Sequence, residues 1–169
     1  MFPGILKIGL CFLLCGAAFA DDGVEHISAL TTKHSGMPVR LRGDDAAVTA
    51  DAFKPPVDIT IIAKTDSTNL RMSYAADQVI FNWEGDVNQL RIDGGPAGGM
   101  HQAGRGRIPT NKYVTIRWLV TPTGQEIYVD GKLRFAHQGD YSKIDSPISV
   151  FPKWGSVVTV KSIKTSVPK

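Results

Sequence analysis

The sequence has 169 residues with 19 basic and 16 acidic side chains, which gives a formal net charge of +3 at pH 7. This small basic excess gives no reason to expect a nucleic-acid partner, and the length suits one domain with one substantial core. The chain contains 17 glycines and no long segment with the apolar period of a helix, so the composition favours an all-β protein.

The N-terminus has the features of a secretory signal peptide. Lys7 precedes an apolar run at residues 8–14, and an A-x-A cleavage site ends at Ala20. The run is shorter than the roughly 18 apolar residues of a transmembrane helix, and no later segment approaches that length. We therefore predict no membrane span and a secreted or periplasmic mature chain of residues 21–169.

Both cysteines, Cys11 and Cys15, lie in the predicted signal peptide. The mature chain would therefore contain no cysteine and could use neither disulfide nor thiolate chemistry, so its stability must come from burial. Leu14 stands directly before Cys15, where a lipoprotein signal carries a small residue, so we do not expect a lipid anchor.

Short alternations of apolar and polar side chains follow one another from Ile59 onward. Turn residues separate them at about 8–12 positions, which is typical of a sandwich or barrel. No repeat or linker divides residues 21–169, so we predict a single domain. The predicted strands are residues 58–64, 69–75, 78–84, 89–93, 113–120, 126–129, 133–136, 148–151 and 157–165, with one or two more at 39–41 and 48–53.

The four predicted strands from residue 58 to residue 93 agree on one buried face if they form a meander. Pairing across the Ala-Asp turn sets Met72 opposite Phe81, and the next pairing sets Phe81 opposite Ile92. The pairing before them sets Ala63 opposite Met72. Because successive side chains alternate between the two faces, this register predicts a core of Ile61, Leu70, Met72, Phe81, Trp83, Leu90 and Ile92.

The opposite face of this meander is polar. One cross-strand row contains Lys64, Arg71, Asn82 and Arg91, with Glu84 beyond it. Like charges set side by side repel one another unless something intervenes. The row is therefore either a solvated face in which Glu84 neutralises its neighbours, or a ligand face whose amide and guanidinium groups bind hydroxyls or carboxylates.

The segment EIYVDGKLRF indicates two strands around an Asp-Gly turn. A two-residue turn would set Val129 opposite Lys132 and mix core with charge. We therefore predict a three-residue loop with Gly131 at positive φ and a bulge. The alternative is that Tyr128 pairs with Leu133 on the outer face of the sheet. In either form the Asp-Gly pair serves backbone geometry and is not evidence of catalysis.

The succession of VTIRWLV, a polar turn, EIYVDGKLRF and a last strand SVVTVKSIKT resembles the laminin G-like group of the concanavalin A-like lectin and glucanase jelly rolls. It also resembles the bacterial family linked to hydrolysis of 3-keto-disaccharides, which shares that sandwich. The resemblance covers residues 58–164 and implies an antiparallel two-sheet β-sandwich. It does not imply one activity, because lectins, glycosidases and adhesion modules share this fold. The usual opening of the hydrolase family, an FDGK-like phrase followed by a tryptophan, is absent.

Catalytic motifs are incomplete in this sequence. Retaining glucanases of this fold use a strand motif E-x-D-x-x-E, whose alternate carboxylates act as nucleophile and acid. The segment EGDVNQ offers Glu84 and Asp86, but it carries Gln89 in the third position and reads as a loop. We therefore favour a protein without catalytic activity, with a glycoside-processing hydrolase of the 3-keto-disaccharide type as the alternative.

Metal-binding motifs are also incomplete. The segment DVNQLRIDG places Leu90 and Arg91 where an EF-hand loop needs an oxygen donor and a glycine. The four histidines do not have the spacing of metal ligands. We therefore predict no cofactor, while a calcium ion held by separated loops, such as one containing Asp93, stays open.

Two further segments allow a functional and a structural interpretation. Residues 94–111 are the longest irregular segment, in which Arg105 and Arg107 beside glycines form either a mobile loop or the rim of an anion site. Trp154 is either an exposed platform that stacks on sugar rings, together with Tyr141, or a core residue between the sheets.

We expect an exported module that binds a carbohydrate, a glycoconjugate or another polar ligand. A protein that contacts only other proteins is a further interpretation, and it would expose a sizeable apolar patch. The predicted ligand-binding residues combine hydrogen-bonding side chains with one aromatic ring for stacking: Arg71, Asn82, Glu84, Arg91, Arg117 and Trp154.

Overall fold

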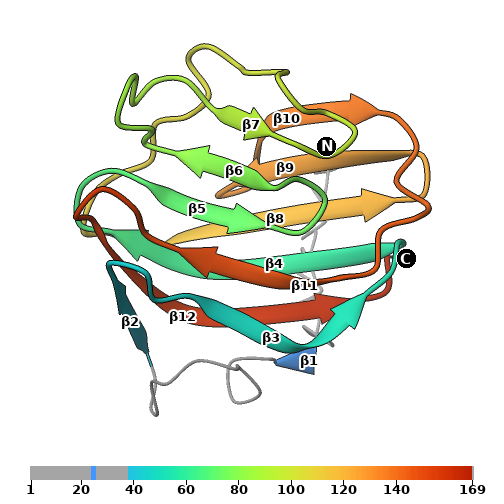
Figure 1. Ribbon diagram of the computed structural model, residues 1–169, viewed down its shortest axis with the longest axis horizontal. Helices are drawn as coiled ribbons and strands as arrows, with labels where there is room; N and C mark the ends of the chain where they lie inside the picture. The colour runs from blue at the N-terminus through green and yellow to red at the C-terminus, as the bar shows by residue number, and fades with distance from the viewer. Residues whose placement is uncertain (1–23, 26–37, 169) are drawn as a thin grey trace, which may run out of the picture.

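The computed structural model describes residues 24–25 and 38–168. The predicted signal peptide, with both cysteines, lies outside the described residues. All regular elements of the described part are β-strands, and they form two antiparallel sheets (Figure 1). Within the same residues, no helix has the length and apolar character needed to cross a membrane.

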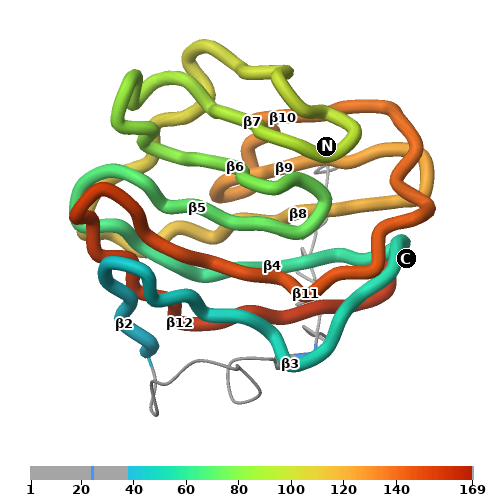
Figure 2. Tube along the Cα trace, in the orientation of Figure 1, coloured from blue at the N-terminus to red at the C-terminus, as the bar shows by residue number. Residues whose placement is uncertain are grey.

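The two sheets stack as layers, and the five-stranded sheet is the nearer one in Figures 1 and 2. The seven-stranded sheet has the order β1 (Val24–Glu25), β12 (Val157–Ser166), β4 (Val57–Thr65), β8 (Val114–Thr121), β9 (Gly124–Val129) and β10 (Lys132–Gln138), and β2 (Val39–Arg42) also pairs with β12. The five-stranded sheet has the order β3 (Ala47–Phe53), β11 (Ser146–Phe151), β5 (Leu70–Ser73), β6 (Gln78–Phe81) and β7 (Arg91–Asp93). The predicted all-β, antiparallel two-sheet sandwich is confirmed.

The core fills the space between the sheets because each strand turns alternate side chains inward. Strand β4 alternates buried and half-buried side chains along its whole length. Trp118 on β8 is fully buried, and its ring meets that of Tyr74 edge-on at a centroid distance of 6.0 Å. Its indole N–H donates to the side-chain oxygen of Gln125 at 2.7 Å. Each fully buried Leu, Ile or Phe of this core contributes about 2 kcal/mol to the free energy of unfolding.

Strand β4 does not belong to the predicted meander, so this part of the predicted pairing is wrong. It pairs with β8 and β12 in the seven-stranded sheet, and the chain then crosses to β5 in the other sheet. The inner faces of both sheets point into one core, so the apolar alternation of β4 fits either sheet. Ile61 and Met72 are both fully buried, but they belong to opposite sheets.

Strands β5, β6 and β7 do pair consecutively, but their registers are displaced by two residues from the predicted ones. Leu70 pairs with Phe81 instead of Trp83, and Ile92 pairs with Val79 instead of Phe81. A displacement of two keeps every side chain on its predicted face. The predicted core residues of these strands are therefore buried, except Trp83, which is half-buried because β6 ends at Phe81.

The turn between β9 and β10 contains two residues, so the predicted three-residue loop is wrong. Asp130 and Gly131 have φ angles of 47° and 75°, the positive values that a type I′ turn requires. Val129 consequently pairs with Lys132.

A bulge between Leu133 and Phe135 restores the inward face of β10. Phe135 is therefore buried, whereas Leu133 is exposed and pairs with Tyr128. This pair is the alternative that the sequence left open, and it is confirmed.

Candidate functional site

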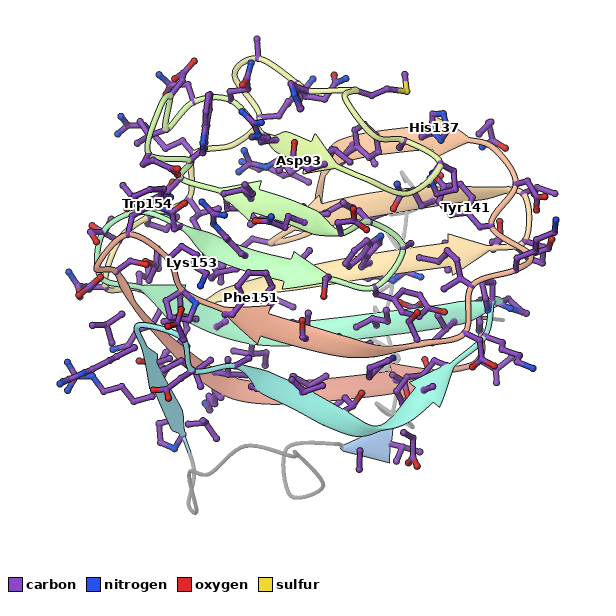
Figure 3. All side chains as sticks on the ribbon, viewed as in Figure 1. Asp93, His137, Tyr141, Phe151, Lys153 and Trp154 are labelled. Atoms are coloured by element: carbon purple, nitrogen blue, oxygen red, sulfur yellow. The ribbon has the colours of Figure 1, made fainter. Side chains whose placement is uncertain are left out.

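The outer face of the five-stranded sheet carries a group of polar side chains on β11, β5, β6 and β7 and on the residues that follow β6, ranging from the buried Arg71 to the exposed Glu84. The ladder places Ser149 opposite Ser73, with their hydroxyl oxygens 2.6 Å apart, and places Gln78 opposite Asp93. The near side of Figure 3 is this face, with Asp93 on β7 and Phe151 on β11. We call it the polar face, and its residues are Arg71, Ser73, Gln78, Glu84, Arg91, Asp93 and Ser149.

The side chains of the polar face form a packed layer over the sheet. Ile80 pairs with Arg71 on one side and with Arg91 on the other, so it belongs to the same outer row. Its exposed fraction is nevertheless only 1%. The neighbouring polar side chains must therefore cover it, and they do so at positions that the strands fix.

Arg71 holds this layer together from its centre. It is only 8% exposed, and its guanidinium donates to the side-chain oxygen of Asn69 at 2.8 and 3.1 Å. It also donates to the side-chain oxygen of Gln78 and to both carboxylate oxygens of Glu84, at 3.3 and 3.2 Å. Because a desolvated guanidinium binds its acceptors in fixed directions, Arg71 orients Gln78 and Glu84.

Arg91 is a less buried residue of the polar face, and the ring of Trp83 lies beside it. The guanidinium carbon of Arg91 lies 4.6 Å from the centroid of the Trp83 ring, which is a cation–π contact. Its Nε donates to both carboxylate oxygens of Asp93 at 3.0 Å. Across the described residues, the two terminal nitrogens of Arg91 have no protein acceptor. Arg91 therefore presents free N–H donors in an orientation that the ring and the carboxylate hold.

Trp154 adds an exposed aromatic ring at one end of the polar face. It is 75% exposed and lies in the turn that follows β11, with a φ of 54°. Figure 3 shows it beyond Phe151, on the side where β11 ends. Beside it, Lys153 donates to a carboxylate oxygen of Asp44 at 2.6 Å, and this hydrogen bond lowers the pKa of Asp44. Of the two interpretations of Trp154, the structure shows the exposed ring.

Tyr141 does not join Trp154 in an aromatic platform, so that part of the prediction is wrong. Its ring is fully buried, and its hydroxyl lies 2.7 Å from Nδ1 of His137. Burial raises the pKa of Tyr141. Figure 3 shows it at the opposite end of the molecule from Trp154, beside β10.

Asn82 belongs to the connection between β6 and the later loop rather than to the exposed surface. It is 3% exposed, and its amide nitrogen donates to the carbonyl oxygens of Ser67 at 3.1 Å and Ile108 at 3.0 Å. Its amide oxygen accepts the backbone N–H of Ile108 at 2.8 Å. Both donors and the acceptor are engaged, so Asn82 fixes the segment around Ile108 against the sheet.

The segment 94–111 packs against β6 and β7. Leu90 and Gln102 exchange two backbone hydrogen bonds of 2.9 Å. A Cβ atom added at Gly106 would lie 2.1 Å from the carbonyl oxygen of Gln89, so only glycine fits there. Where this segment meets the end of β6, a hollow of about 580 Å³ opens beside Arg107 and Ile108.

Arg117 lies on the outer face of the other sheet. Its Nε and Nη2 donate to the two oxygens of Asp58 at 2.9 and 2.6 Å, and this pairing raises the pKa of Arg117. The core separates Arg117 from Arg71. The structure therefore brings Arg71, Glu84 and Arg91 together, with Trp154 at the end of the same face, and sets Arg117 apart.

Several residues of the polar face are absent from the sequence-based prediction. Ser149 is distant in sequence, and its strand pairs with β5 only in the folded sheet. Trp83 was expected in the core. The alternation of β11, in which Ser149 falls between buried Ile148 and Val150, is the signal that could have identified Ser149 as an outward residue.

Metal ligands do not gather in the part of the chain that the structure describes. Among the residues that the structure describes, no group of three or more His, Cys, Asp and Glu side chains could hold a metal ion. The two carboxylates of the polar face, Glu84 and Asp93, are each paired with an arginine.

No family model and no curated protein matches the chain. Solved structures match its fold. The Bacillus licheniformis β-glucanase superposes with a TM-score of 0.61 at 9% identity, over 85% of this chain and 97% of that one. The Caenorhabditis elegans galectin LEC-6 superposes with a TM-score of 0.54 at 12% identity, over 82% of this chain and 96% of the galectin. A Bacillus subtilis carbohydrate-binding module superposes with a TM-score of 0.57 at 10% identity, over 83% of this chain and 96% of the module.

These likenesses concern the fold alone, because the identities are low. They confirm the resemblance to the concanavalin A-like lectin and glucanase jelly rolls at the level of the fold.

Proposed function

We propose that the chain is an exported carbohydrate-binding module and that the polar face, with Trp83 and Trp154, is its binding surface. One observation carries this proposal: the oriented donors and acceptors of the polar face lie on the sheet at whose end the exposed Trp154 ring stands. A sugar ring has an apolar C–H surface and an edge of hydroxyls, so it requires both kinds of partner. The likeness in fold to a galectin and to a carbohydrate-binding module supports the proposal.

The polar face suits sugar hydroxyls because its groups are already fixed. Glu84 and Asp93 offer carboxylate oxygens as acceptors, and Arg91, beside Asp93, offers terminal N–H donors that no described residue engages. Arg71 and the Trp83 ring restrict these side chains before a ligand arrives. Little side-chain entropy is then lost on binding, which favours affinity. The proposed binding involves no metal ion, so we expect chelation with EDTA to leave it unchanged.

Glycan-array binding of the purified chain and two variants tests the proposal. Trp154→Ala removes the exposed ring, and Arg91→Ala removes the free donors; we expect each to weaken glycan binding about tenfold or more. Leu133→Ala is the matched control, because Leu133 is also an exposed apolar residue but lies on β10 in the other sheet. Binding that is unchanged in both Trp154→Ala and Arg91→Ala would refute this site.

A glycoside-processing hydrolase, of the 3-keto-disaccharide hydrolase type, is the second candidate function. The observation that favours it is that two carboxylates, Glu84 and Asp93, lie on one face, and glycoside hydrolysis commonly uses such a pair. The chain would be screened for turnover of 3-keto-glucosides and β-glucans. Turnover that Glu84→Gln abolishes, while the loop control Asp86→Asn retains it, would establish the enzyme over the binding module.

A further inference from the structure

A second group of charged side chains lies on the outer face of the seven-stranded sheet, where β2, β12 and β4 are neighbours. Arg40 pairs across the ladder with Thr159, and Thr159 pairs with Lys64 on its other side. Neighbouring strands lie about 4.8 Å apart. The backbones of Arg40 and Lys64 are therefore about 10 Å apart, with a hydroxyl between them.

Tyr113 brings a third cation to the same place. The Nζ atoms of Lys64 and Lys161 lie 5.0 and 5.9 Å from the centroid of the Tyr113 ring. Cation–π attraction thus holds two ammonium groups near one ring, although like charges repel. We call Arg40, Lys64, Lys161 and Tyr113 the basic cluster.

Among the residues that the structure describes, the cations of this cluster have no carboxylate partner, unlike Arg71, Arg91 and Arg117. Like charges this close repel one another unless a counter-charge lies between them. The cluster should therefore bind an anion from outside the molecule.

Asp66 is a carboxylate beside the cluster, but its Oδ1 is already engaged. It accepts the backbone N–H of Val157 at 2.8 Å and the hydroxyl of Ser67 at 2.9 Å. The three cations outnumber this one carboxylate, so the surroundings stay positive.

The cluster borders a hollow of about 250 Å³ whose lining combines charge with neutral hydrogen-bonding groups. Arg40, Lys64 and Tyr113 line it together with Asp66, Asn111 and Thr159. Its volume is below the roughly 300–1,000 Å³ of a pocket that encloses a whole ligand. It therefore suits one charged group of a longer chain better than a complete small molecule.

We propose that the basic cluster binds the sulfate or carboxylate groups of an acidic polysaccharide. The cations supply charge-assisted hydrogen bonds to such groups, and Thr159 and Asn111 supply partners for neighbouring hydroxyls. A membrane fits less well, because the large exposed apolar side chains of the described residues, such as Met100, Leu133 and Trp154, do not line this hollow. A nucleic acid also fits less well, because lysines already occupy the ring of Tyr113 on which a base would stack.

Calorimetric titration of the full chain with dextran sulfate tests this proposal, with dextran as the uncharged match. We expect dextran sulfate to bind, dextran not to bind, and the affinity to fall as sodium chloride is added. The double change Lys64→Gln with Lys161→Gln should weaken binding about tenfold. The matched control changes Lys132→Gln and Lys143→Gln, which removes the same charge from exposed positions outside the cluster, and should weaken it less than about twofold.

Three outcomes would overturn the proposal: no binding of dextran sulfate, equal weakening in the two double variants, or tighter binding to phosphatidylglycerol vesicles than to dextran sulfate. Thermal unfolding of each variant shows whether it is folded.

Arg40→Gln serves as an independent variant, because Arg40 is exposed and its change leaves the Tyr113 contacts in place. It should weaken dextran sulfate binding about threefold, and an unchanged affinity would also count against the proposal.

Discussion

Arg71 and Arg91 show how one residue type serves two purposes on the same face. Arg71 is buried, and its guanidinium donates hydrogen bonds to Asn69, Gln78 and Glu84. It therefore fixes the orientation of these side chains. Arg91 donates to Asp93 through its Nε, and its terminal nitrogens have no acceptor among the described residues. Replacing Arg71 would therefore disturb the layer itself, whereas replacing Arg91 removes donors from the surface and leaves the layer in place.

Tyr74 should make the fold sensitive to alkaline pH. Burial raises the pKa of its phenol above the usual value of 10.0, and the charge of Asp145 adds to this shift. The folded state thus disfavours the phenolate, so the contribution of Tyr74 to stability is complete below pH 10.0 and is lost as the pH rises above it. Between about pH 9 and about pH 11, the free energy of unfolding should fall more steeply in the parent than in Tyr74→Phe, by up to about 1.4 kcal/mol per pH unit above pH 10.

Urea unfolding followed by tryptophan fluorescence at each pH measures this difference. All other side chains are the same in both proteins, so their effect on the pH profile cancels in the comparison. Parallel pH profiles of the parent and Tyr74→Phe would contradict the assignment.

For β5 and β7, the face of the sheet on which a residue lies could be predicted, but the segments that pack over that face could not. Strand parity correctly set Arg71 and Arg91 on the face opposite Met72 and Ile92. The burial of Asn82 depends on the segment around Ile108, which comes 26 residues later and meets it only in the folded protein. No local pattern contains this information.

Strands could be predicted more easily than their partners. The alternation in β4, β8 and β12 identified them as strands, because one face is buried and the other is not. The partner of β4 could not be inferred, since a strand after a short turn can either pair with its neighbour or cross to the opposite sheet. The turn between β9 and β10 was mispredicted because the bulge that corrects its parity lies in the strand and not in the turn.

Gly131→Ala should destabilise the β9–β10 hairpin through the backbone alone. No atom lies within 4 Å of the position of an added Cβ, but the φ of 75° is unfavourable for alanine. We expect a loss of about 1 kcal/mol in the free energy of unfolding, measured by urea denaturation. Asp130→Asn is the control, because asparagine tolerates positive φ and keeps the oxygen that accepts the Thr115 N–H at 2.9 Å. A loss of equal size in both variants would contradict this explanation.

The molecule carries two groups of charged side chains on opposite outer faces, separated by a continuous core. The polar face carries paired charges beside the half-buried Trp83 and has the exposed Trp154 at its end, whereas the cations of the basic cluster on the other sheet have no carboxylate partner among the described residues. The sandwich itself could be predicted from side-chain parity, whereas the two surfaces depend on pairings such as β2 with β12 that only the complete fold creates. The possible protein partner of this chain, which the sequence analysis considered, remains a prediction.

The two proposed sites should bind their ligands independently. A neutral glycan identified on the array and dextran sulfate should each bind with an affinity that changes less than about twofold when the other is saturating. Trp154→Ala should weaken only the glycan, and the Lys64→Gln, Lys161→Gln double variant only dextran sulfate. Calorimetric titration of each ligand with the other present measures this, and mutual competition would show that both ligands use one surface.

Strand β12 has a consequence for how the chain folds during synthesis. It lies between β4 and β2, so that Val39 finds its neighbour Val160 only after almost the entire polypeptide has been made. Until then β2 and β4 each have an open edge, which other chains could join. Pairings between such distant segments also form slowly. A product that terminates before Val157 would leave this edge of β4 unpaired and should aggregate.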